Sequence, residues 1–298
     1  MQTKVTKAIF PVAGMGTRFL PATKSVPKEI MTLVDRPLVQ YAIDEARAAG
    51  IEEFIFVTAK GKSALEDYFD HSPALEQELE AKGKDDLLEI LKSTNMESGQ
   101  IAYLRQAKAL GLGHAVWCAR RMIHDEPFAV ILPDDVIAAE TPCLKQMVDA
   151  YQETGGNMVA AMEVPHEKTK SYGVLDIKDD MGSIVSVNGM VEKPKPEEAP
   201  SNLAVIGRYI LSPQIMKNLE AAETGAGGEI QLTDAIAREI GEDKTGVYGF
   251  RFRGQRFDCG SKAGFLQATV AFGLARDDLR DDLDAYLQDV MAARSAAQ

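Results

Sequence analysis

Short β-rich runs alternate with helical patterns through the first half of the chain, and this alternation constrains the fold more than any other feature. The expected strands are residues 7–12, 53–58, 101–104, 128–132 and 157–162. Two of them contain FIFV and FAVIL, near-continuous apolar runs that are typical of strands buried on both faces. A helical pattern over residues 37–50 begins with a proline and ends with a glycine. Because strands that alternate with helices build parallel sheets, we predict an α/β fold that binds ligands at the carboxyl ends of its strands.

The second half of the chain has a different pattern. Its expected strands are residues 173–177, 184–187, 204–211 and 247–252. They are short and separated by turns, which favours mixed or antiparallel additions to the sheet. A charged helical stretch over residues 72–95 predicts an excursion on the surface.

A helix is also predicted at the end of the chain, over residues 276–298. It carries one apolar stripe, formed by Leu279, Leu283, Tyr286 and Val290. We expect this stripe to pack on the chain's own core, and contact with another subunit is the alternative. Residues 1–275 are expected to form one domain.

Composition narrows the class of partner. The chain has 298 residues, a net charge of −12 and 45% hydrophobic residues, a globular profile with material for a large core. An acidic surface repels a phosphate backbone, so we expect no nucleic-acid partner. No apolar run approaches the ~18 residues that a membrane span needs, so no membrane partner is expected either. The three cysteines (Cys118, Cys143 and Cys259) form no CxxC pair, which argues against a disulfide framework and favours a reducing, cytoplasmic setting.

A glycine-rich turn, AGMGTR at residues 13–18, follows the first expected strand. Glycines there let backbone N–H groups approach phosphate oxygens closely. The dinucleotide fingerprint needs a third glycine where this chain has Phe19, and a complete Walker loop is absent. Arg18, Lys24 and Lys28 place three cations within about ten residues of the strand end, which suits a polyphosphate. The alternative is an ordinary turn with solvated basic residues.

Two adjacent carboxylates, Asp134 and Asp135, follow the expected strand at residues 128–132. Bringing two carboxylates together is costly unless a cation or water compensates them. A hard divalent ion such as Mg²⁺ needs only one or two protein carboxylates and takes its other oxygens from substrate and water. Asp258, which also follows an expected strand, is the natural second ligand. The alternative is that Asp134 or Asp135 caps the next turn.

Two further segments carry candidate binding residues. Gln106 can donate and accept hydrogen bonds at once, which fits the edge of uracil or thymine. Gly111 and Gly113 permit close approach of a base or ribose to the backbone. Glu192 can bind sugar hydroxyls and Lys193 can neutralise a sugar phosphate, although an exposed ion pair is the common alternative.

Taken together, these motifs resemble those of the sugar-1-phosphate nucleotidylyltransferases. In the family's order they are AGMGTR (13–18) with VPKE (26–29), LGLGHAV (110–116), ILPD (131–134), SYGV (171–174), VEKP (191–194), NLA (202–204), IGRY (206–209) and GEIQLTDA (228–235). The match covers roughly residues 5–275. The particular amino acids within these motifs are similar to those of the bacterial members that use UTP and glucose 1-phosphate. The resemblance implies a Rossmann-like, mixed and mostly parallel sheet with helices on both faces.

The resemblance also implies roles for individual residues. The nucleotide would be lined by Ala13, Gly14 and Gly16, and uracil would be read by Gln106 and Gly111. Departing pyrophosphate would be held by Arg18 and Lys28, and Mg²⁺ by Asp134 and Asp258. Glucose would contact Gly173, Glu192 and Gly207, and the phosphates would contact Lys193. Residues 1–155 would then form a nucleotide-binding half and residues 156–275 a sugar-binding half. Asp135 is left out of the metal set because family members vary there, and Glu229 receives no role.

The implied reaction transfers a uridylyl group from UTP to α-D-glucose 1-phosphate, giving UDP-glucose and pyrophosphate. The sugar phosphate is already anionic, so the site must align two repelling anions and spread charge, which bound Mg²⁺ assists. We expect a homo-oligomer.

Three other functions stay open at this point. A thymidylyltransferase of the same fold differs by one methyl in the base, worth only ~1–3 kcal/mol. A nicotinamide-dependent oxidoreductase is disfavoured by Phe19. A non-catalytic sugar-nucleotide sensor is disfavoured by the presence of Asp134, Lys193 and Asp258.

Overall fold

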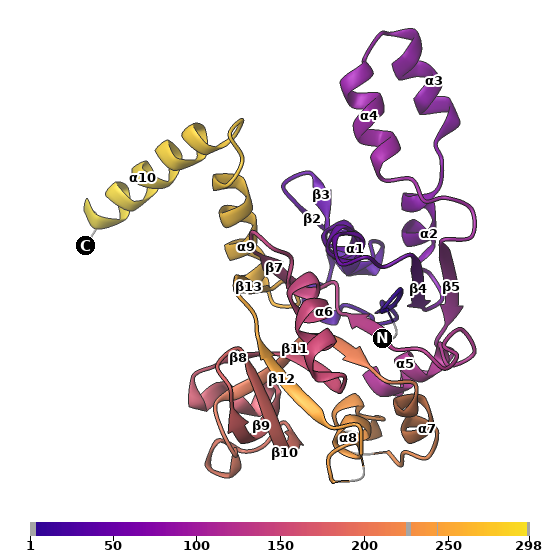
Figure 1. Ribbon diagram of the computed structural model, residues 1–298. Helices are drawn as coiled ribbons and strands as arrows, with labels where there is room; N and C mark the ends of the chain where they lie inside the picture. The colour runs from indigo at the N-terminus through magenta and orange to yellow at the C-terminus, as the bar shows by residue number, and fades with distance from the viewer. Residues whose placement is uncertain (1–3, 225–227, 243, 297–298) are drawn as a thin grey trace.

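The computed structural model describes residues 4–224, 228–242 and 244–296. Its centre is a nine-stranded sheet made of β1 (Lys7–Pro11), β4 (Glu53–Thr58), β5 (Ile101–Arg105), β6 (Phe128–Ile131), β8 (Asn157–Glu163), β9 (Gly173–Asp180), β10 (Ile184–Glu192), β11 (Leu203–Leu211) and β12 (Val247–Arg251). The strand order is β5-β4-β1-β6-β11-β8-β12-β10-β9 (Figure 1). Two small ribbons accompany it, β2 (Thr32–Leu33) with β3 (Arg36–Pro37) and β7 (Asp135–Ala138) with β13 (Gln255–Asp258). All nine strands predicted from the sequence are therefore confirmed.

The sheet is mixed, as predicted, but its parallel share is smaller than expected. The parallel neighbours in the described chain are β5 with β4, β4 with β1, β1 with β6 and β8 with β12. The antiparallel neighbours are β6 with β11, β11 with β8, β12 with β10 and β10 with β9. Since β11 also pairs antiparallel with β9, four of the nine strand pairings of this sheet in the described chain are parallel, rather than most of them. The reason is that β8 to β11 follow one another through turns and 3-10 segments, and parallel neighbours need longer crossovers.

Helices cover both faces of the sheet, as predicted. They are α1 (Leu38–Ala48), α2 (Ser63–Phe69), α3 (Pro73–Ala81), α4 (Asp85–Ser93), α5 (Leu112–Cys118), α6 (Cys143–Thr154), α7 (Gln214–Glu220), α8 (Leu232–Ala237), α9 (Lys262–Leu274) and α10 (Arg280–Ala296). The chain has a hydrophobic core on each face of the sheet. In one core Phe10 packs with residues of α1 and α6, and in the other Ile9 packs with residues of α5, α7 and α8. Consecutive side chains of a strand point to opposite faces, so β1 contributes to both cores. Helix α1 begins at Leu38, so Pro37 is its N-cap, with an extended backbone, rather than the first-turn residue that the sequence predicted.

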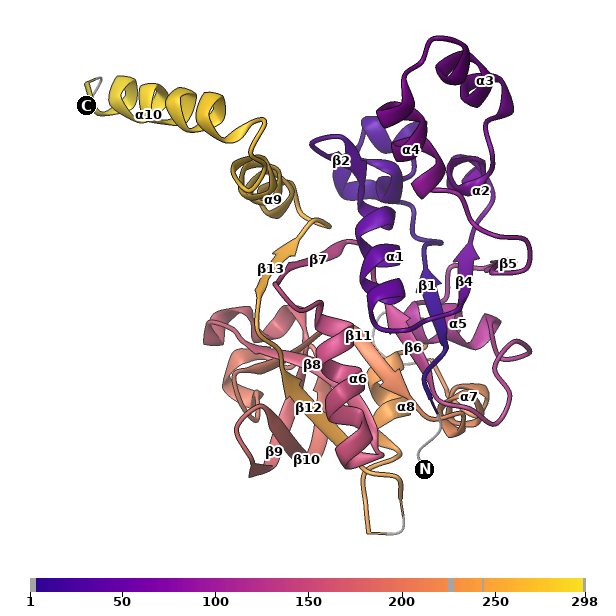
Figure 2. The same cartoon turned by 45° about the horizontal axis from the view of Figure 1, so that its top comes forward.

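Two segments stand away from this body. Helices α3 and α4 contain no buried residue and form the protruding hairpin of Figure 1, which confirms the excursion predicted over residues 72–95. Helix α10 also has no buried residue and runs outward from α9 (Figures 1 and 2). Tyr286 is 65% exposed, so the prediction that the apolar stripe packs on the core is wrong. The stripe approaches the rest of the chain at Leu283, whose side chain lies against Gly273 of α9. Within the described residues, no helix combines the length and apolar character needed to cross a membrane.

Candidate active site

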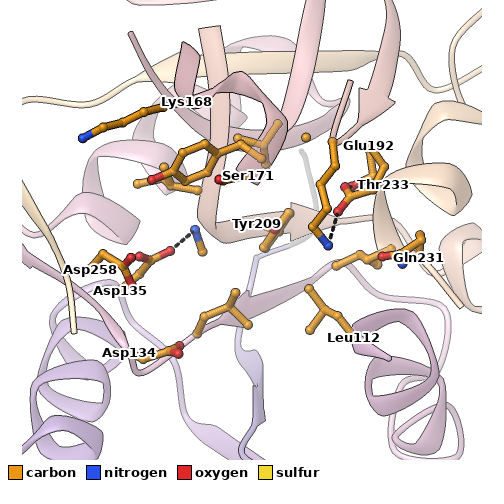
Figure 3. Close-up of a pocket in the computed structure, with 18 of the residues that line it drawn as sticks. Leu112, Asp134, Asp135, Lys168, Ser171, Glu192, Tyr209, Gln231, Thr233 and Asp258 are labelled. Carbon is orange, nitrogen blue, oxygen red and sulfur yellow. Dashed lines mark hydrogen bonds and ion pairs between the residues drawn. The ribbon is translucent and has the colours of Figure 1, made fainter. Parts of the chain in front are cut away.

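A cavity of about 750 Å³ is lined by the loop that follows β6, by β13, and by residues of β9, β10 and β11. Seven predicted site residues line it: Arg18, Asp134, Gly173, Glu192, Lys193, Gly207 and Asp258. Six other predicted residues, all described by the structure, lie outside the lining: Ala13, Gly14, Gly16, Lys28, Gln106 and Gly111. Figure 3 shows Asp134, Asp135 and Asp258 on one side of the cavity and Glu192 and Thr233 on the other. We call the first side, with Arg18 and Lys28, the charged wall, and the side of Gly173, Glu192, Lys193 and Gly207 the strand wall.

The glycine turn packs directly on the segment that carries Lys28. Gly16 has a left-handed backbone, with φ at 64°, and a Cβ there would lie 3.3 Å from the Cβ of Lys28. At Gly14 an added Cβ would lie 4.0 Å from the Lys28 Cε. Arg18 donates from Nη1 to the Gly260 carbonyl at 3.0 Å, which joins the turn to the loop after β13. The turn, Lys28 and the Asp258 loop therefore form one packed unit.

Lys28 and Asp134 are ion-pair partners. The Lys28 Nζ lies 2.5 Å from Asp134 Oδ2. Burial opposes the charge of Lys28, but the attraction of Asp134 and Glu29 outweighs it and raises the Lys28 pKa. Burial likewise opposes the charge of Asp134, and Lys28 outweighs it and lowers the Asp134 pKa. Both groups are thus charged over a wide pH range, and the pairing of Lys28 with Asp134 was not predicted from the sequence.

The carboxylates of Asp134 and Asp258 converge, although the two residues are far apart in the chain. They belong to the β7–β13 ribbon region, where Asp258 pairs with Asp135. A Cβ added to Gly260 would lie 2.9 Å from Asp134 Oδ2 and 3.0 Å from Asp258 Oδ1, so both oxygens surround the same small volume. Hard divalent ions accept such a pair and complete their shell from substrate and water. In the described part of the chain, no three acidic, histidine or cysteine side chains are grouped to hold a metal.

Asp135 has a different environment from its neighbour. It is buried, and its Oδ1 accepts hydrogen bonds from Arg256 Nε, at 2.7 Å, and from Arg256 Nη2. Its Oδ2 accepts from the Gly207 N–H at 2.9 Å. A Cβ at Gly207 would lie 2.7 Å from that same oxygen, which explains why this strand position holds glycine. Asp135 therefore ties the strand wall to Arg256.

A buried guanidinium fixes the loop that carries Asp134. Arg208 is 1% exposed and pairs with both carboxylate oxygens of Glu45 at 2.9 Å. It also donates to the carbonyls of Leu132, at 3.0 Å, and Asp135, at 2.7 Å. These two carbonyls flank Asp134, so one fully paired group holds the loop on both sides. Sequence analysis missed this pair, and an arginine inside the apolar run LAVIGRYIL was the available signal.

Lys193, on the strand wall, has an unusual backbone conformation. Its φ is 48°, a left-handed value that non-glycine residues rarely adopt and that clusters at functional sites. The Lys193 N–H donates to the Tyr172 carbonyl at 2.9 Å, and its Nζ lies 3.1 Å from Glu192 Oε1. Glu192 Oε2 accepts from the Thr233 hydroxyl at 2.7 Å. A Cβ at Gly173 would lie 3.3 Å from the same Glu192 oxygen. The carboxylate is thereby held on two sides.

Gln106 and Gly111 contact each other rather than the cavity. Gln106 Nε2 donates to the Gly111 carbonyl at 3.0 Å and lies 3.0 Å from His114 Nδ1. Gly111 has a φ of 92°, and a Cβ there would lie 2.7 Å from the Glu229 Cβ. At Gly113 an added Cβ would lie 2.7 Å from a backbone carbonyl of residue 230. The close approach that the glycines permit is therefore made by residues 229–231 of the same chain.

A second buried ion pair lies behind the charged wall. Lys62 Nζ lies 2.8 Å from Glu29 Oε2 and also donates to the carbonyl of Val12, the residue before the glycine turn. Burial raises the pKa of Glu29 and lowers that of Lys62. Because Glu29 follows Lys28, this pair joins the turn to the Lys28 segment. The glutamate of VPKE was the signal that sequence analysis left unused.

The comparisons with known proteins agree with this geometry. The nucleotidyl transferase family pattern matches residues 7–273. A UTP–glucose-1-phosphate uridylyltransferase from Komagataeibacter xylinus is 54% identical over 86% of this chain and 89% of its own length. One from Bacillus subtilis (strain 168) is 50% identical over 97% of this chain and 98% of its own.

Solved structures give the same result. A UDP-glucose pyrophosphorylase complexed with UDP-glucose has a TM-score of 0.83 and 41% identity, and covers 91% of this chain and 100% of that one. A UTP-bound UGPase from Acinetobacter baumannii has a TM-score of 0.87 and 41% identity, with coverages of 95% and 99%. The resemblance in the motifs is thus confirmed across almost the whole chain. The chain belongs to the nucleotidyl transferase family.

Proposed function

We propose that this chain transfers a uridylyl group from UTP to α-D-glucose 1-phosphate, giving UDP-glucose and pyrophosphate. The observation that carries the proposal is the near full-length identity of 47–54% to curated relatives with this activity in their names. Solved relatives complexed with UDP-glucose and with UTP support the same substrates. The cavity adds a physical basis, because it gathers cations, carboxylates and a polar strand edge around one volume.

The reaction needs alignment more than acid–base chemistry. The phosphate of glucose 1-phosphate carries an anionic oxygen at neutral pH, so it can attack the α-phosphorus of UTP without a general base. The protein must bring the two anions, UTP and glucose 1-phosphate, together, and it must supply positive charge to the departing pyrophosphate. Arg18 and Lys28 of the charged wall suit the pyrophosphate, and Lys193 of the strand wall suits the phosphate of the sugar.

Asp134 and Asp258 are the residues that we propose to hold Mg²⁺. Nucleotidyltransferases of this family generally use a divalent metal ion. When bound, the ion supplies positive charge to the reacting phosphate groups. Since Lys28 is paired with Asp134, we propose that Lys28 exchanges this carboxylate for a phosphate oxygen as substrate binds. That exchange keeps both of these partly buried charges paired throughout.

The remaining predicted residues receive binding roles in the proposal. Gly173, Glu192 and Gly207 form the sugar subsite, where the Glu192 carboxylate can accept hydrogen bonds from hydroxyls. Ala13, Gly14 and Gly16 offer backbone to the nucleotide. Gln106 and Gly111 are proposed to read uracil, and their mutual hydrogen bond means that they would act as one unit. Residues 1–155 and 156–275 remain our proposed nucleotide and sugar halves.

The alternatives receive less support. At the third position of a dinucleotide fingerprint this chain has Phe19, which packs edge-on against Phe265 at 5.6 Å between ring centroids, whereas a nicotinamide-binding fingerprint needs a glycine there for close helix–strand packing. Binding without catalysis would not need the convergent carboxylates. We also propose a cytoplasmic setting, which the three free cysteines support, and a homo-oligomer.

The test is a pyrophosphate-release assay over UTP, dTTP, CTP, ATP and GTP with glucose 1-phosphate, with and without Mg²⁺. We expect release with UTP that depends on glucose 1-phosphate and on Mg²⁺, at a kcat/KM about tenfold or more above that for dTTP. Higher kcat/KM with dTTP would make the chain a thymidylyltransferase. Binding of UDP-glucose without any release would make it a sensor, and tight NAD⁺ binding would favour the oxidoreductase.

A further inference from the structure

Arg256 connects three segments around the cavity. Its side chain is only 10% exposed. Through Nε and Nη2 it donates to Asp135 Oδ1, and through Nη1 it donates to the Tyr172 hydroxyl at 2.9 Å. The guanidinium carbon lies 5.4 Å from the centre of the Tyr172 ring. One planar group thus spans β13, the start of β7 and the turn before β9.

Each of these contacts lies next to a residue with a proposed role. Asp135 follows Asp134, and Arg256 itself lies two residues before Asp258. Tyr172 precedes Gly173 of the strand wall. Arg256, Asp135 and Tyr172 all line the cavity. The guanidinium therefore bridges the carboxylate side and the sugar side of the site through covalently adjacent residues.

The chemistry of the bridge requires an arginine. Asp135 is buried, so removal of its cation would leave an uncompensated charge. A lysine could neutralise Asp135, but its single ammonium lacks the planar fork that reaches a carboxylate and a phenol at once. Because arginine cannot accept a hydrogen bond, the Tyr172 oxygen must be the acceptor in this contact, and that fixes the orientation of the phenol.

We propose that Arg256 is a positioning residue that couples the two walls of the cavity. Arg256 fixes the position of Tyr172 and the strand wall relative to Asp134 and Asp258. A bound sugar phosphate can then contact the strand wall and the two carboxylates at the same time. The inference rests on the proposed function, since glucose 1-phosphate is the ligand that it positions. It assigns Arg256 an effect on the sugar phosphate and not on the nucleotide.

The variants that test this are Arg256→Lys, Tyr172→Phe and the double variant. Arg256→Lys keeps the charge beside Asp135 and loses the bridge, so we expect about a tenfold rise in KM for glucose 1-phosphate, with KM for UTP within about twofold. Tyr172→Phe leaves the Asp135–Arg256 pair intact and should raise the same KM by a similar factor. Because both changes break one bridge, the double variant should be no worse than the more affected single variant.

Arg251→Lys is the matched control. Arg251 pairs through its fork with both oxygens of Asp180, at 2.8 and 2.9 Å, and lies outside the cavity lining in the described structure. The same substitution there should leave both KM values unchanged.

Several outcomes would overturn the inference. Equal rises in both KM values, or multiplied effects in the double variant, would show that Arg256 does not act through the bridge. A lower unfolding temperature with both KM values unchanged would make Arg256 purely structural. The Kd of glucose 1-phosphate, measured by calorimetry with the complete chain, tests the coupling without turnover. A wild-type chain that binds glucose 1-phosphate but releases no pyrophosphate would contradict the proposed function alone, and the calorimetric cycle would still decide the role of Arg256.

Discussion

The two walls of the cavity are held in place by different kinds of interaction. The charged wall rests on two ion pairs, the partly buried pair of Lys28 with Asp134 and the buried pair of Lys62 with Glu29. The strand wall rests on close backbone approach at glycines and on the left-handed backbone of Lys193. The first wall should therefore be sensitive to loss of charge, and the second to an added methyl group or a changed backbone. Asp135, through Gly207 and Arg256, is where the two kinds of support meet.

The largest expected effect is on the charged wall, in the Asp258→Asn variant. This change keeps the shape of the side chain and removes half of the carboxylate pair, so we expect kcat to fall by about a thousandfold or more. The measurement is pyrophosphate release at saturating Mg²⁺, with thermal unfolding to show a retained fold. The control is Asp289→Asn on the exposed helix α10. Near-normal turnover of Asp258→Asn at saturating Mg²⁺ would refute the metal assignment.

The Lys193→Ala variant removes a positive charge, the Lys193 ammonium group, from the strand wall. Loss of the cation beside the sugar phosphate should lower kcat by about a hundredfold, while the Kd of UTP changes by less than about threefold. Steady-state kinetics and nucleotide titration measure the two effects. Lys195→Ala, two residues further along at an exposed ion pair with Glu198, is the matched control. An equal loss of UTP binding would place Lys193 on the nucleotide side instead.

Gly207→Ala tests the other support of the strand wall, close packing. The new Cβ would lie 2.7 Å from both Asp135 Oδ2 and the Leu132 Cβ, so the strand or the Asp135 loop must shift. We expect a loss of about 1–3 kcal/mol in the free energy of unfolding, together with weaker binding of glucose 1-phosphate. At Gly189 the nearest neighbour of an added Cβ is 3.8 Å away, so Gly189→Ala should change neither quantity. Equal behaviour of the two variants would contradict the packing argument.

Lys28→Met gives the most pH-dependent effect on the free energy of unfolding. In the wild type the Asp134 pKa is lowered, so the stability from this pair is complete above the ordinary aspartate pKa of about 3.9 and is lost as pH falls through the lowered value. The Lys28 pKa is raised, so its share is complete below about 10.4 and is lost as pH rises through the raised value. The variant should therefore be less stable than wild type by about 1–3 kcal/mol at pH 7.

Denaturant unfolding at pH 3, 5 and 7 checks this prediction. The difference between wild type and Lys28→Met should shrink towards pH 3, because Asp134 then becomes protonated in the variant. Lys24→Met, which removes a nearby cation of the same turn region, is the control. A difference that stays constant over these pH values would show that the stability change does not come from the charge of Asp134.

The sequence predicted what depends on local pattern or on topology. Buried strands such as β4 and β6 can be predicted because their apolar residues are continuous in sequence. That Asp134 and Asp258 lie at the same edge of the sheet follows from the positions at which the strands end. The ion-pair partners of the buried arginines could not be predicted from the sequence, because Arg208 and Glu45 are 163 residues apart and Arg256 and Asp135 are 121 residues apart. No local pattern encodes such pairs.

Two other features show the same limit. The glycine spacing at Gly111 predicted the close approach of a base or ribose, which stays a prediction, and it did not indicate that Glu229 of the same chain lies against this position. The stripe on α10 indicated an apolar face, but amphipathicity does not say what covers that face, and the helix stands away from the body.

The most direct test of the account is whether Asp134 and Asp258 share one cation. The measurement is the Kd of Mn²⁺, by electron paramagnetic resonance, for the chain saturated with a non-hydrolysable UTP analogue. We expect Mn²⁺ binding to be weakened about tenfold or more in both Asp134→Asn and Asp258→Asn, with the double variant close to the weaker-binding single variant. Wild-type affinity in either single variant would contradict it.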